Sequence, residues 1–121
     1  VSFGLTKELL TFWRYYGFVW VHIGTHRDKS TGLHAAVMIK PLTEAGEQLV
    51  KRMEEKWHAD VYHLKEAPFL RPESRALLPE GVLGSFDYWD QRMLAAARTY
   101  RKPKSALYCA LRREELVVDK D

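Results

Sequence analysis

The first seventeen residues combine an extended pattern with a helical one. Val1–Phe3 alternates apolar and polar residues and ends at Gly4, which predicts a short strand. Thr6 is a suitable N-cap, and the apolar residues between Leu9 and Tyr16 recur at helical spacing. Gly17 follows them, as glycine commonly follows the last turn of a helix. We therefore expect a strand followed directly by a helix.

Two more strands are predicted after this helix. Phe18–Ile23 is rich in β-branched and aromatic residues, and Leu33–Lys40 repeats that character before Pro41 ends it. The polar segment Gly24–Gly32 between them predicts a loop. The first third of the chain is thus predicted as strand, helix and long-looped hairpin.

The rest of the chain has helical periodicity. Apolar residues recur every four positions at Ala45, Leu49, Met53, Trp57 and Val61, and we interpret this stripe as core or inter-domain packing. Tyr88, Trp89 and Met93 are assigned in the same way to the apolar side of a later helix. In chain order we expect a helix over Glu44–Tyr62, an irregular connector over Ala67–Gly84 with one helical turn at Glu73–Leu78, a helix capped by Ser85 and ended by Pro103, and a helix over Ser105–Val117.

Composition is typical of a globular domain, and the predicted strands and helices place that domain in the α+β class. The chain has 121 residues, of which 46% are hydrophobic and 29% charged, and this balance excludes wholesale disorder. The single cysteine, Cys109, excludes an internal disulfide framework and is interpreted as a small buried hydrophobe in a reducing compartment. Uncharged runs such as Tyr15–Val21 are far too short to cross a bilayer. We expect a cytoplasmic protein with no membrane partner.

Six short motifs in the first 42 residues occur in the order found in a known family. They are Ser-Phe-Gly-x-Thr at 2–6, Glu-Leu at 8–9, Phe-Trp-x-x-x-Gly-Phe at 12–18, Gly-x-His-Arg at 24–27, Ser-Thr-Gly at 30–32 and Pro-Leu at 41–42. The segment resembles the second half of a GNAT-type acetyltransferase domain and, more narrowly, is similar to the tRNA(Met) cytidine acetyltransferases. The resemblance implies that residues 1–41 are the distal half of a GNAT domain and that residues 42–121 are a helical, tRNA-binding tail.

This resemblance implies N4-acetylation of a cytidine in a tRNA anticodon, with acetyl-CoA as donor and ATP and magnesium used by a module elsewhere in the full protein. The chain itself has no Gly-x-x-x-x-Gly-Lys-Ser/Thr phosphate loop. It also lacks the Arg/Gln-x-x-Gly-x-Gly/Ala loop that holds the CoA pyrophosphate at a helix N-terminus. We therefore expect a fragment that is inactive alone and that self-associates through the exposed first strand at Val1–Gly4.

The resemblance also assigns positions in the first helix. Glu8 matches an acidic residue that lines the acetyl-CoA site, although a surface glutamate that favours a helix N-terminus is the alternative. Tyr15 stands where the family has a cofactor-contacting arginine, and Arg14 lies about 100° away around the helix. Trp13 stands where many GNAT enzymes have a tyrosine acid, but an indole N–H has no useful acidity. The catalytic residue is left unassigned.

The hairpin loop is the candidate substrate side. A polar loop that needs Gly32 for a positive φ is the alternative. His22 and His26 would lie about 13 Å apart on a strand, so no metal site is expected. The resemblance places four residues toward the substrate: His26, Arg27, Ser30 and His34.

Basic charge is concentrated near the C-terminus. The chain carries a formal charge of +3, whereas the segment 98–113 has six Lys or Arg residues and no acid. Phosphate backbones respond to such a field and tyrosine rings can stack on unpaired bases, although a solvated cationic face is the alternative. The Arg-x-Pro break and the Ser-x-Leu-x-Cys-x-Leu-Arg helix resemble the family's tail. The candidate RNA-binding residues are Arg98, Tyr100, Arg101, Lys102, Lys104, Arg112 and Arg113.

Two other functions stay open at this point. The chain could belong to a GNAT enzyme that acts on a protein or a small amine, with the helical tail as a dimerisation element. It could also be a non-catalytic RNA-binding module that retains half of a GNAT core. Binding of tRNA distinguishes the first alternative from the family function, and the presence of an upstream catalytic half distinguishes the second.

Overall fold

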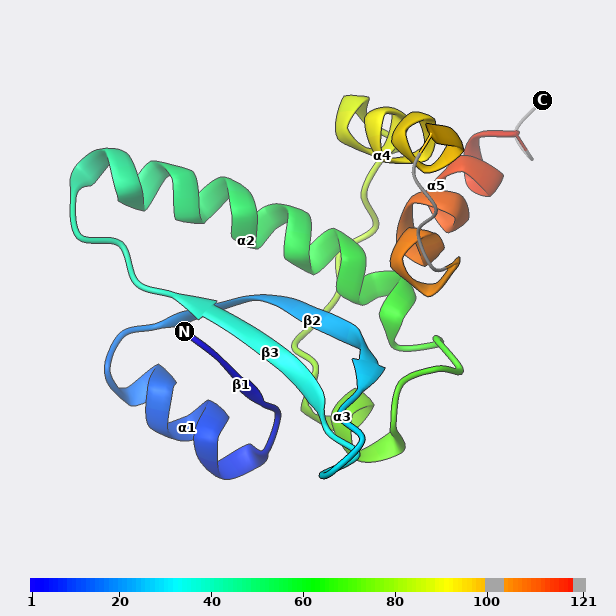
Figure 1. Ribbon diagram of the computed structural model, residues 1–121. Helices are drawn as coiled ribbons and strands as arrows, with labels where there is room; N and C mark the ends of the chain where they lie inside the picture. The colour runs from blue at the N-terminus through cyan, green and yellow to red at the C-terminus, as the bar shows by residue number, and fades with distance from the viewer. Residues whose placement is uncertain (100–103, 119–121) are drawn as a thin grey trace.

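The computed structural model describes residues 1–99 and 104–118, and it confirms a mixed α+β class with one small sheet and several helices (Figure 1). In this view the sheet lies between α1 and the long helix α2. The elements are β1 (Ser2–Gly4), α1 (Lys7–Tyr15), β2 (Val19–Arg27), β3 (His34–Ile39), α2 (Glu44–Leu64), α3 (Pro72–Leu77), α4 (Tyr88–Thr99), a 3-10 turn η1 (Lys104–Leu107) and α5 (Tyr108–Val118).

The three strands form an antiparallel sheet in the order β1-β3-β2. Phe3 of β1 pairs with Ala36 of β3, and Trp20 of β2 pairs with Met38 of β3. Successive side chains of a strand point to opposite faces, and in β3 Ala36 and Met38 are buried while Ala35 is exposed. One face of the sheet therefore packs against the core, and β1 is an edge strand.

Helix α1 has the ends that the sequence predicts. The Thr6 hydroxyl accepts the backbone N–H of Leu9 at 3.2 Å, as an N-cap does. Gly17 has a φ of 86°, a left-handed conformation in which a Cβ would be strained, and its N–H donates to the Arg14 carbonyl at 3.0 Å. The chain thereby turns from the helix directly into β2.

The hairpin loop is shorter than the sequence predicts. We expected a loop over Gly24–Gly32, but β2 continues to Arg27 and only residues 28–33 connect the strands. Arg27 still pairs with His34, after an irregularity in the register that starts at Ile23. Polar residues thus continue the strand here, because pairing with β3 decides the conformation more strongly than their composition does.

Helix α2 confirms the predicted long helix, and its C-terminal half enters the core. Trp57 and Val61 are buried, and the Trp57 ring lies 5.0 Å from that of Trp20 in β2. Core packing does not extend to the N-terminal half, because Leu49 and Met53 are 53% and 39% exposed, and for these residues inter-domain packing stays a prediction. The sheet underlies only part of this long helix, so the same periodicity has two different environments.

The connector after α3 packs closely on α2 because two glycines lack side chains. A Cβ on Gly81 would lie 2.5 Å from the backbone nitrogen of Tyr62, and a Cβ on Gly84 would lie 2.8 Å from the Cβ of Ala59. The N–H of Val82 donates to the His58 carbonyl of α2 at 2.9 Å. The connector is therefore held to α2 along its length and delivers α4 to the same side.

The sequence places the start of α4 incorrectly. Ser85 was expected as its cap, but the helix begins at Tyr88 and Asp87 caps it. The Asp87 carboxylate accepts the N–H of Asp90 at 2.9 Å, and the Asp90 carboxylate accepts the N–H of Asp87 at 3.3 Å. This reciprocal pair has the spacing of a capping box, which an aspartate supports as well as a serine does.

The two predicted segments share one core. Trp20 and Met38 from the first 41 residues lie in the same buried cluster as Trp57, Leu64 and Leu70 from the rest. Within the residues that the structure describes, no helix is both long enough and apolar enough to span a bilayer. The division at residue 41 stays a prediction.

Candidate functional site

Helix α1 presents two of the predicted cofactor residues to solvent. Glu8 is exposed in the first turn and Tyr15 is 83% exposed in the last. Seven residues make nearly two full turns, so both side chains leave the helix on the same side, about 10 Å apart along its axis. The guanidinium of Arg14 points elsewhere and lies 5.9 Å from the centre of the Trp20 ring.

These residues fit only part of an acetyl-CoA site. Glu8 and Tyr15 provide an acidic side chain and an aromatic surface, whereas a cofactor phosphate requires cationic or N–H donors. Arg14 is directed to Trp20 and does not replace the arginine that the resemblance places at Tyr15. Helix α1 therefore lacks a guanidinium for the phosphates on the side of Glu8.

Trp13 has a packing role. Its ring lies 5.0 Å from Phe18, 5.2 Å from Phe12 and 6.4 Å from Phe3, so it links α1 to the strands on either side. Edge-to-face and stacked contacts of this kind stabilise aromatic clusters. This cluster fixes the orientation of α1 and of the exposed side that holds Glu8.

The predicted substrate-side residues do not form one surface. His26 and Arg27 are exposed on β2, and Ser30 is exposed in the turn. The turn is ordered by the Asp28 carboxylate, which accepts the N–H groups of Ser30 at 2.6 Å and Thr31 at 3.1 Å. The bond from Ser30 is the main reason why the pKa of Asp28 lies below its usual value.

His34 lies inside the fold, and its assignment to the substrate side is wrong. Its side chain is fully buried, and Nδ1 lies 3.0 Å from the Gly24 carbonyl and 3.1 Å from that of His26. Carbonyls accept, so Nδ1 holds the proton, and Nε2 accepts the N–H of Arg71 at 3.2 Å. Burial is the main cause of its lowered pKa. His34 joins the hairpin to the start of α3.

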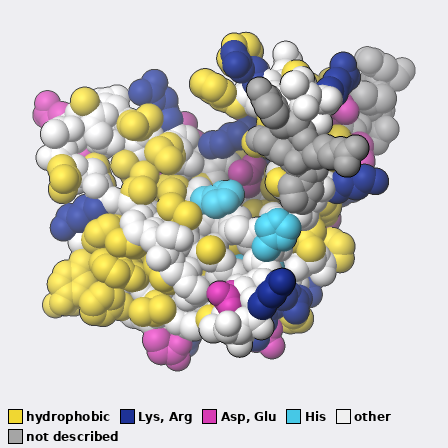
Figure 2. Space-filling model, in the orientation of Figure 1, with side chains coloured by type: hydrophobic (Ala, Val, Ile, Leu, Met, Phe, Trp, Pro, Cys, Tyr) yellow, Lys and Arg dark blue, Asp and Glu magenta, His cyan; other side chains and the backbone are white. Residues whose placement is uncertain are grey.

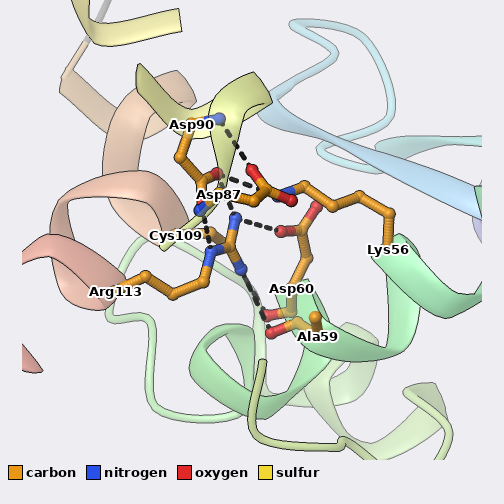
Figure 3. A network of polar contacts seen from close by, with 7 residues as sticks. All are labelled: Lys56, Ala59, Asp60, Asp87, Asp90, Cys109 and Arg113. Carbon is orange, nitrogen blue, oxygen red and sulfur yellow. Dashed lines mark hydrogen bonds and ion pairs between the residues drawn. The ribbon is translucent and has the colours of Figure 1, made fainter. Parts of the chain in front are cut away.

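The strongest electrostatic feature joins α2, α4 and α5. Arg113 of α5 is 2% exposed, and its guanidinium donates to both oxygens of Asp90 at 2.7 Å (Figure 3). It also pairs with Asp60 at 2.9 Å and donates to the Ala59 carbonyl at 3.3 Å. Lys56 reaches Asp90 at 2.9 Å from the opposite side. We call Lys56, Asp60, Asp87, Asp90 and Arg113 the ion-pair network.

The network corrects one predicted RNA contact. Arg113 was assigned to RNA phosphates, but its donors are directed to Asp90, Asp60 and Ala59 inside the fold. Burial by itself would raise the pKa of Asp90, but the hydrogen bonds from Arg113 and Lys56 outweigh it and lower that pKa to about 2. Arg113 therefore holds α5 against α2 and α4. Only the Asp-x-x-Asp spacing at 87–90 signals part of this network in the sequence.

Cys109 packs beside the network. Its thiol lies 3.6 Å from the Asp60 carbonyl, and burial raises its pKa to about 12. A thiol with such a pKa is not a nucleophile near neutral pH. The interpretation of Cys109 as a small hydrophobe agrees with this environment.

Three of the other predicted RNA contacts lie outside the described residues. Arg98 and Lys104 are exposed, and Arg112 is partly exposed, with its guanidinium 3.4 Å from Glu115 and 3.8 Å from Glu66. Residues 1–99 and 104–118 contain no group of three or more His, Cys, Asp or Glu side chains placed to hold a metal ion. The contacts outside the described part are Tyr100, Arg101 and Lys102.

Comparison with known proteins supports the resemblance along most of the chain. Residues 1–43 match the family model described as GNAT acetyltransferase 2. The tRNA(Met) cytidine acetyltransferase TmcA of Yersinia pestis is 34% identical over 113 residues, which is 93% of this chain and 16% of that protein. The protein of the same name from Pectobacterium atrosepticum is 31% identical over 114 residues, 92% of this chain and 16% of its own length. That from Haloferax volcanii is 46% identical over 52 residues, 43% of this chain and 7% of its own.

These relatives are much longer than the chain. The chain spans about a sixth of the two bacterial relatives that match over most of it, since 16% of each is covered. The similarity to them includes the helical segment as well as the sheet, because 113 aligned residues exceed the 43 that match the family model.

Proposed function

Because this chain belongs to the tRNA(Met) cytidine acetyltransferase family, we propose that it forms part of an enzyme that acetylates the exocyclic amine of a cytidine in tRNA(Met). The observation that supports this most strongly is the 34% identity over 93% of the chain, which includes both the sheet and the helices. Residues 1–41 would contribute the distal half of the acetyltransferase domain, and residues 42–121 would dock the tRNA. Acetyl transfer would require the longer protein.

Acetyl-CoA would supply the acetyl group as a thioester. The chain's own contribution is positioning: Glu8 and Tyr15 share one side of α1, which the Trp13 aromatic cluster holds in a fixed orientation. The guanidinium that the phosphates need is not on that side of α1, so the main phosphate contacts would come from the longer protein, which would also use ATP. His26, Arg27 and Ser30 are the exposed hairpin residues that could approach the substrate.

The second proposed role is electrostatic docking of tRNA by the helical segment. Exposed Arg98 and Lys104 belong to the basic run, residues 98–113, which contains no acid in the sequence. Arg112 is weakened as a phosphate contact by Glu66 and Glu115, and Arg113 is excluded by its burial. The contacts that we retain are Arg98, Tyr100, Arg101, Lys102 and Lys104, with Arg112 at their edge.

Titration of labelled tRNA by fluorescence anisotropy, repeated across salt concentrations, tests the docking role. The affinity is expected to fall steeply with salt, because each phosphate contact releases a counterion. A double Arg98→Glu/Lys104→Glu variant should lose most of the binding. A double Lys40→Glu/Lys65→Glu variant makes the same change in net charge at exposed positions outside the basic run and should lose little. Equal loss in both variants would show that only net charge matters.

The acetylation itself is tested in the full-length protein. Mass spectrometry of tRNA incubated with acetyl-CoA and ATP should detect N4-acetylcytidine, and none with the 121-residue chain alone. A Glu8→Gln variant should raise the KM for acetyl-CoA with a smaller effect on the KM for tRNA. Acetylation of a protein or small amine instead of tRNA would contradict the proposal.

Self-association of the isolated chain is a further expectation. β1 pairs with β3 only, among the described strands, so one of its edges is open. Leu9, Phe12 and Tyr16 of the neighbouring α1 are exposed at 39%, 48% and 51%. Sedimentation should show a concentration-dependent dimer or larger species. A strictly monomeric profile at high concentration would contradict this.

A further inference from the structure

Three side chains at the start of α4 form a solvent-facing cluster that the sequence analysis assigned to an apolar, packed side. Tyr88 and Trp89 are 59% and 67% exposed, and their rings lie 5.5 Å apart in an edge-to-face arrangement. The guanidinium of Arg92 lies 5.8 Å from the centre of the Tyr88 ring and donates to the Tyr88 hydroxyl at 3.0 Å. We call Tyr88, Trp89 and Arg92 the aromatic–arginine cluster.

Trp89 also borders a groove between α2 and α4. The groove has a volume of about 830 Å³, and its lining residues include Val21, Leu49, Arg52, Met53, Trp57 and Trp89. In Figure 2 the surface is hollowed between the part formed by α2 and the part formed by α4, with hydrophobic, basic and acidic side chains beside the hollow. Leu49 and Met53, which the core leaves exposed, thus form part of an open apolar floor.

The lining of the groove carries both signs of charge: Arg52 and Lys56 are basic, and Glu55, Asp60 and Asp87 are acidic. Asp90 is the one acidic residue of α4, and it is 1% exposed and paired with Arg113 and Lys56. Asp87 pairs with the same Lys56 at 3.1 Å. The ion-pair network therefore neutralises Asp60, Asp87 and Asp90 with Arg113 and Lys56, Glu55 stays exposed, and the exposed charges of α4 itself are Arg92 and Arg98.

We propose that this groove binds unpaired nucleotides of RNA, with the Trp89 indole stacked on a base and Arg92 and Arg52 at the phosphates. The inference rests on the proposed function, in that the partner is RNA. It adds a second contact surface, distinct from the basic run, and a preference for unpaired over duplex RNA.

The chemistry of the cluster favours an unpaired strand. Exposed aromatic rings stack on the faces of bases, and those faces are accessible only where the bases are not already stacked in a helix. Guanidinium groups next to the rings supply N–H donors in the geometry that phosphate accepts. Arg92 uses one donor on Tyr88 and keeps others, so it can hold the ring and bind a phosphate together.

An apolar groove could also bind a segment of another protein. Titration with RNA distinguishes the two occupants. Two labelled RNAs of equal length, an unstructured single strand and a duplex, are titrated with the 121-residue chain. We expect tighter binding of the single strand. Trp89→Ala should weaken it at least about fivefold, which is the lower end for loss of one stacking aromatic. Binding of the duplex should change little.

Matched variants separate stacking from folding and from charge. Trp89→Phe keeps an aromatic ring and should retain most of the affinity for the single strand. Tyr62→Ala removes an exposed aromatic side chain outside the groove lining and should leave it unchanged. Arg52→Gln and Arg92→Gln should reduce the slope of affinity against salt, whereas Trp89→Ala should not.

Intrinsic fluorescence gives a second readout. All four tryptophans lie in the described residues, and Trp89 is the most exposed of them at 67%. Trp20 and Trp57 are nearly fully buried, and Trp13 is partly buried. Single-stranded RNA should therefore quench the emission mainly through Trp89, and Trp89→Phe should abolish the change. A Trp89→Ala variant that binds the single strand as the parent chain does would overturn the inference, while sensitivity of the same binding to Arg98→Glu/Lys104→Glu would leave the proposed function intact. Absence of any RNA binding would overturn both.

Discussion

Replacement of Asp90 by alanine should destabilise the chain more than any other loss of a single carboxylate. Asp90 accepts two bonds of 2.7 Å from Arg113 and one of 2.9 Å from Lys56, and it is 1% exposed. Removing one partner of a buried ion pair typically costs about 3–5 kcal/mol, because the other charge remains buried. Arg113 keeps Asp60 at 2.9 Å, so we expect a cost near the lower limit, about 3 kcal/mol.

Urea unfolding of the 121-residue chain, followed by circular dichroism and tryptophan fluorescence, measures this cost. Glu115→Ala is the matched control, because it removes an exposed carboxylate 3.4 Å from Arg112 and should cost less than about 0.5 kcal/mol. A double-mutant cycle of Asp90→Ala with Arg113→Ala should give a coupling energy above about 1 kcal/mol. A cost below about 1 kcal/mol for Asp90→Ala would refute the importance that we give to the network.

The pH dependence provides an independent check. The pKa of Asp90 is about 2 in the folded chain and 3.8 as an ordinary aspartate, so the unfolded chain binds more protons between these values. The stabilisation is fully present above pH 3.8 and is lost as the pH falls through about 2. It amounts to roughly 2 kcal/mol from this difference in pKa. Asp90→Asn should remove this acid-dependent part of the stability curve, and an unchanged curve would contradict the assignment.

Three smaller predictions concern packing, a buried histidine and a buried thiol. Gly81→Ala should lower the free energy of unfolding in urea by about 1–3 kcal/mol, because its Cβ would lie 2.5 Å from the Tyr62 nitrogen. Gly24→Ala is the control and should lower it far less, because the nearest neighbour of its Cβ would lie at 3.6 Å. Equal losses in the two variants would contradict the packing. Burial lowers the pKa of His34, so the contribution of His34 to stability is complete above pH 6.5 and declines as the pH falls below 6.5. The urea midpoint of a His34→Gln variant should therefore decline less below pH 6.5 than that of the parent chain. An equally steep decline would contradict the assignment. Cys109, with a pKa of about 12, should react with a thiol reagent at pH 8 only when the chain unfolds, and fast labelling of the folded chain would count against its burial.

Local patterns in the sequence were sufficient for the ends of α1 and the extent of α2. Thr6 and Gly17 act within their own turn of the backbone, so their roles do not depend on distant residues. The family motifs in residues 1–42 also led to the correct family, which the comparisons confirm. The predicted contacts of Glu8 and Tyr15 with acetyl-CoA stay predictions.

Positions that depend on contacts between distant residues were predicted wrongly. His34 and Arg113 have polar side chains that suit a surface, and only their pairing with groups 10 and 23 residues away shows that they are internal. In the reverse sense, Leu49 and Trp89 have apolar side chains at helical spacing, yet both are exposed at the groove. A periodic pattern identifies one side of a helix but not what covers that side.

The sequence by itself determined the order of strands and helices, the ends of α1, the start of α2, and membership of the family, because each depends on neighbouring residues or on motifs in fixed order. Only the tertiary structure decided which polar residues are buried and which aromatic residues face solvent. A charged side chain can be buried when an opposite charge on another helix lies in contact with it, as Asp90 of α4 does with Arg113 of α5. That contact depends on how α4 and α5 pack on α2, and this packing is a property of the whole chain.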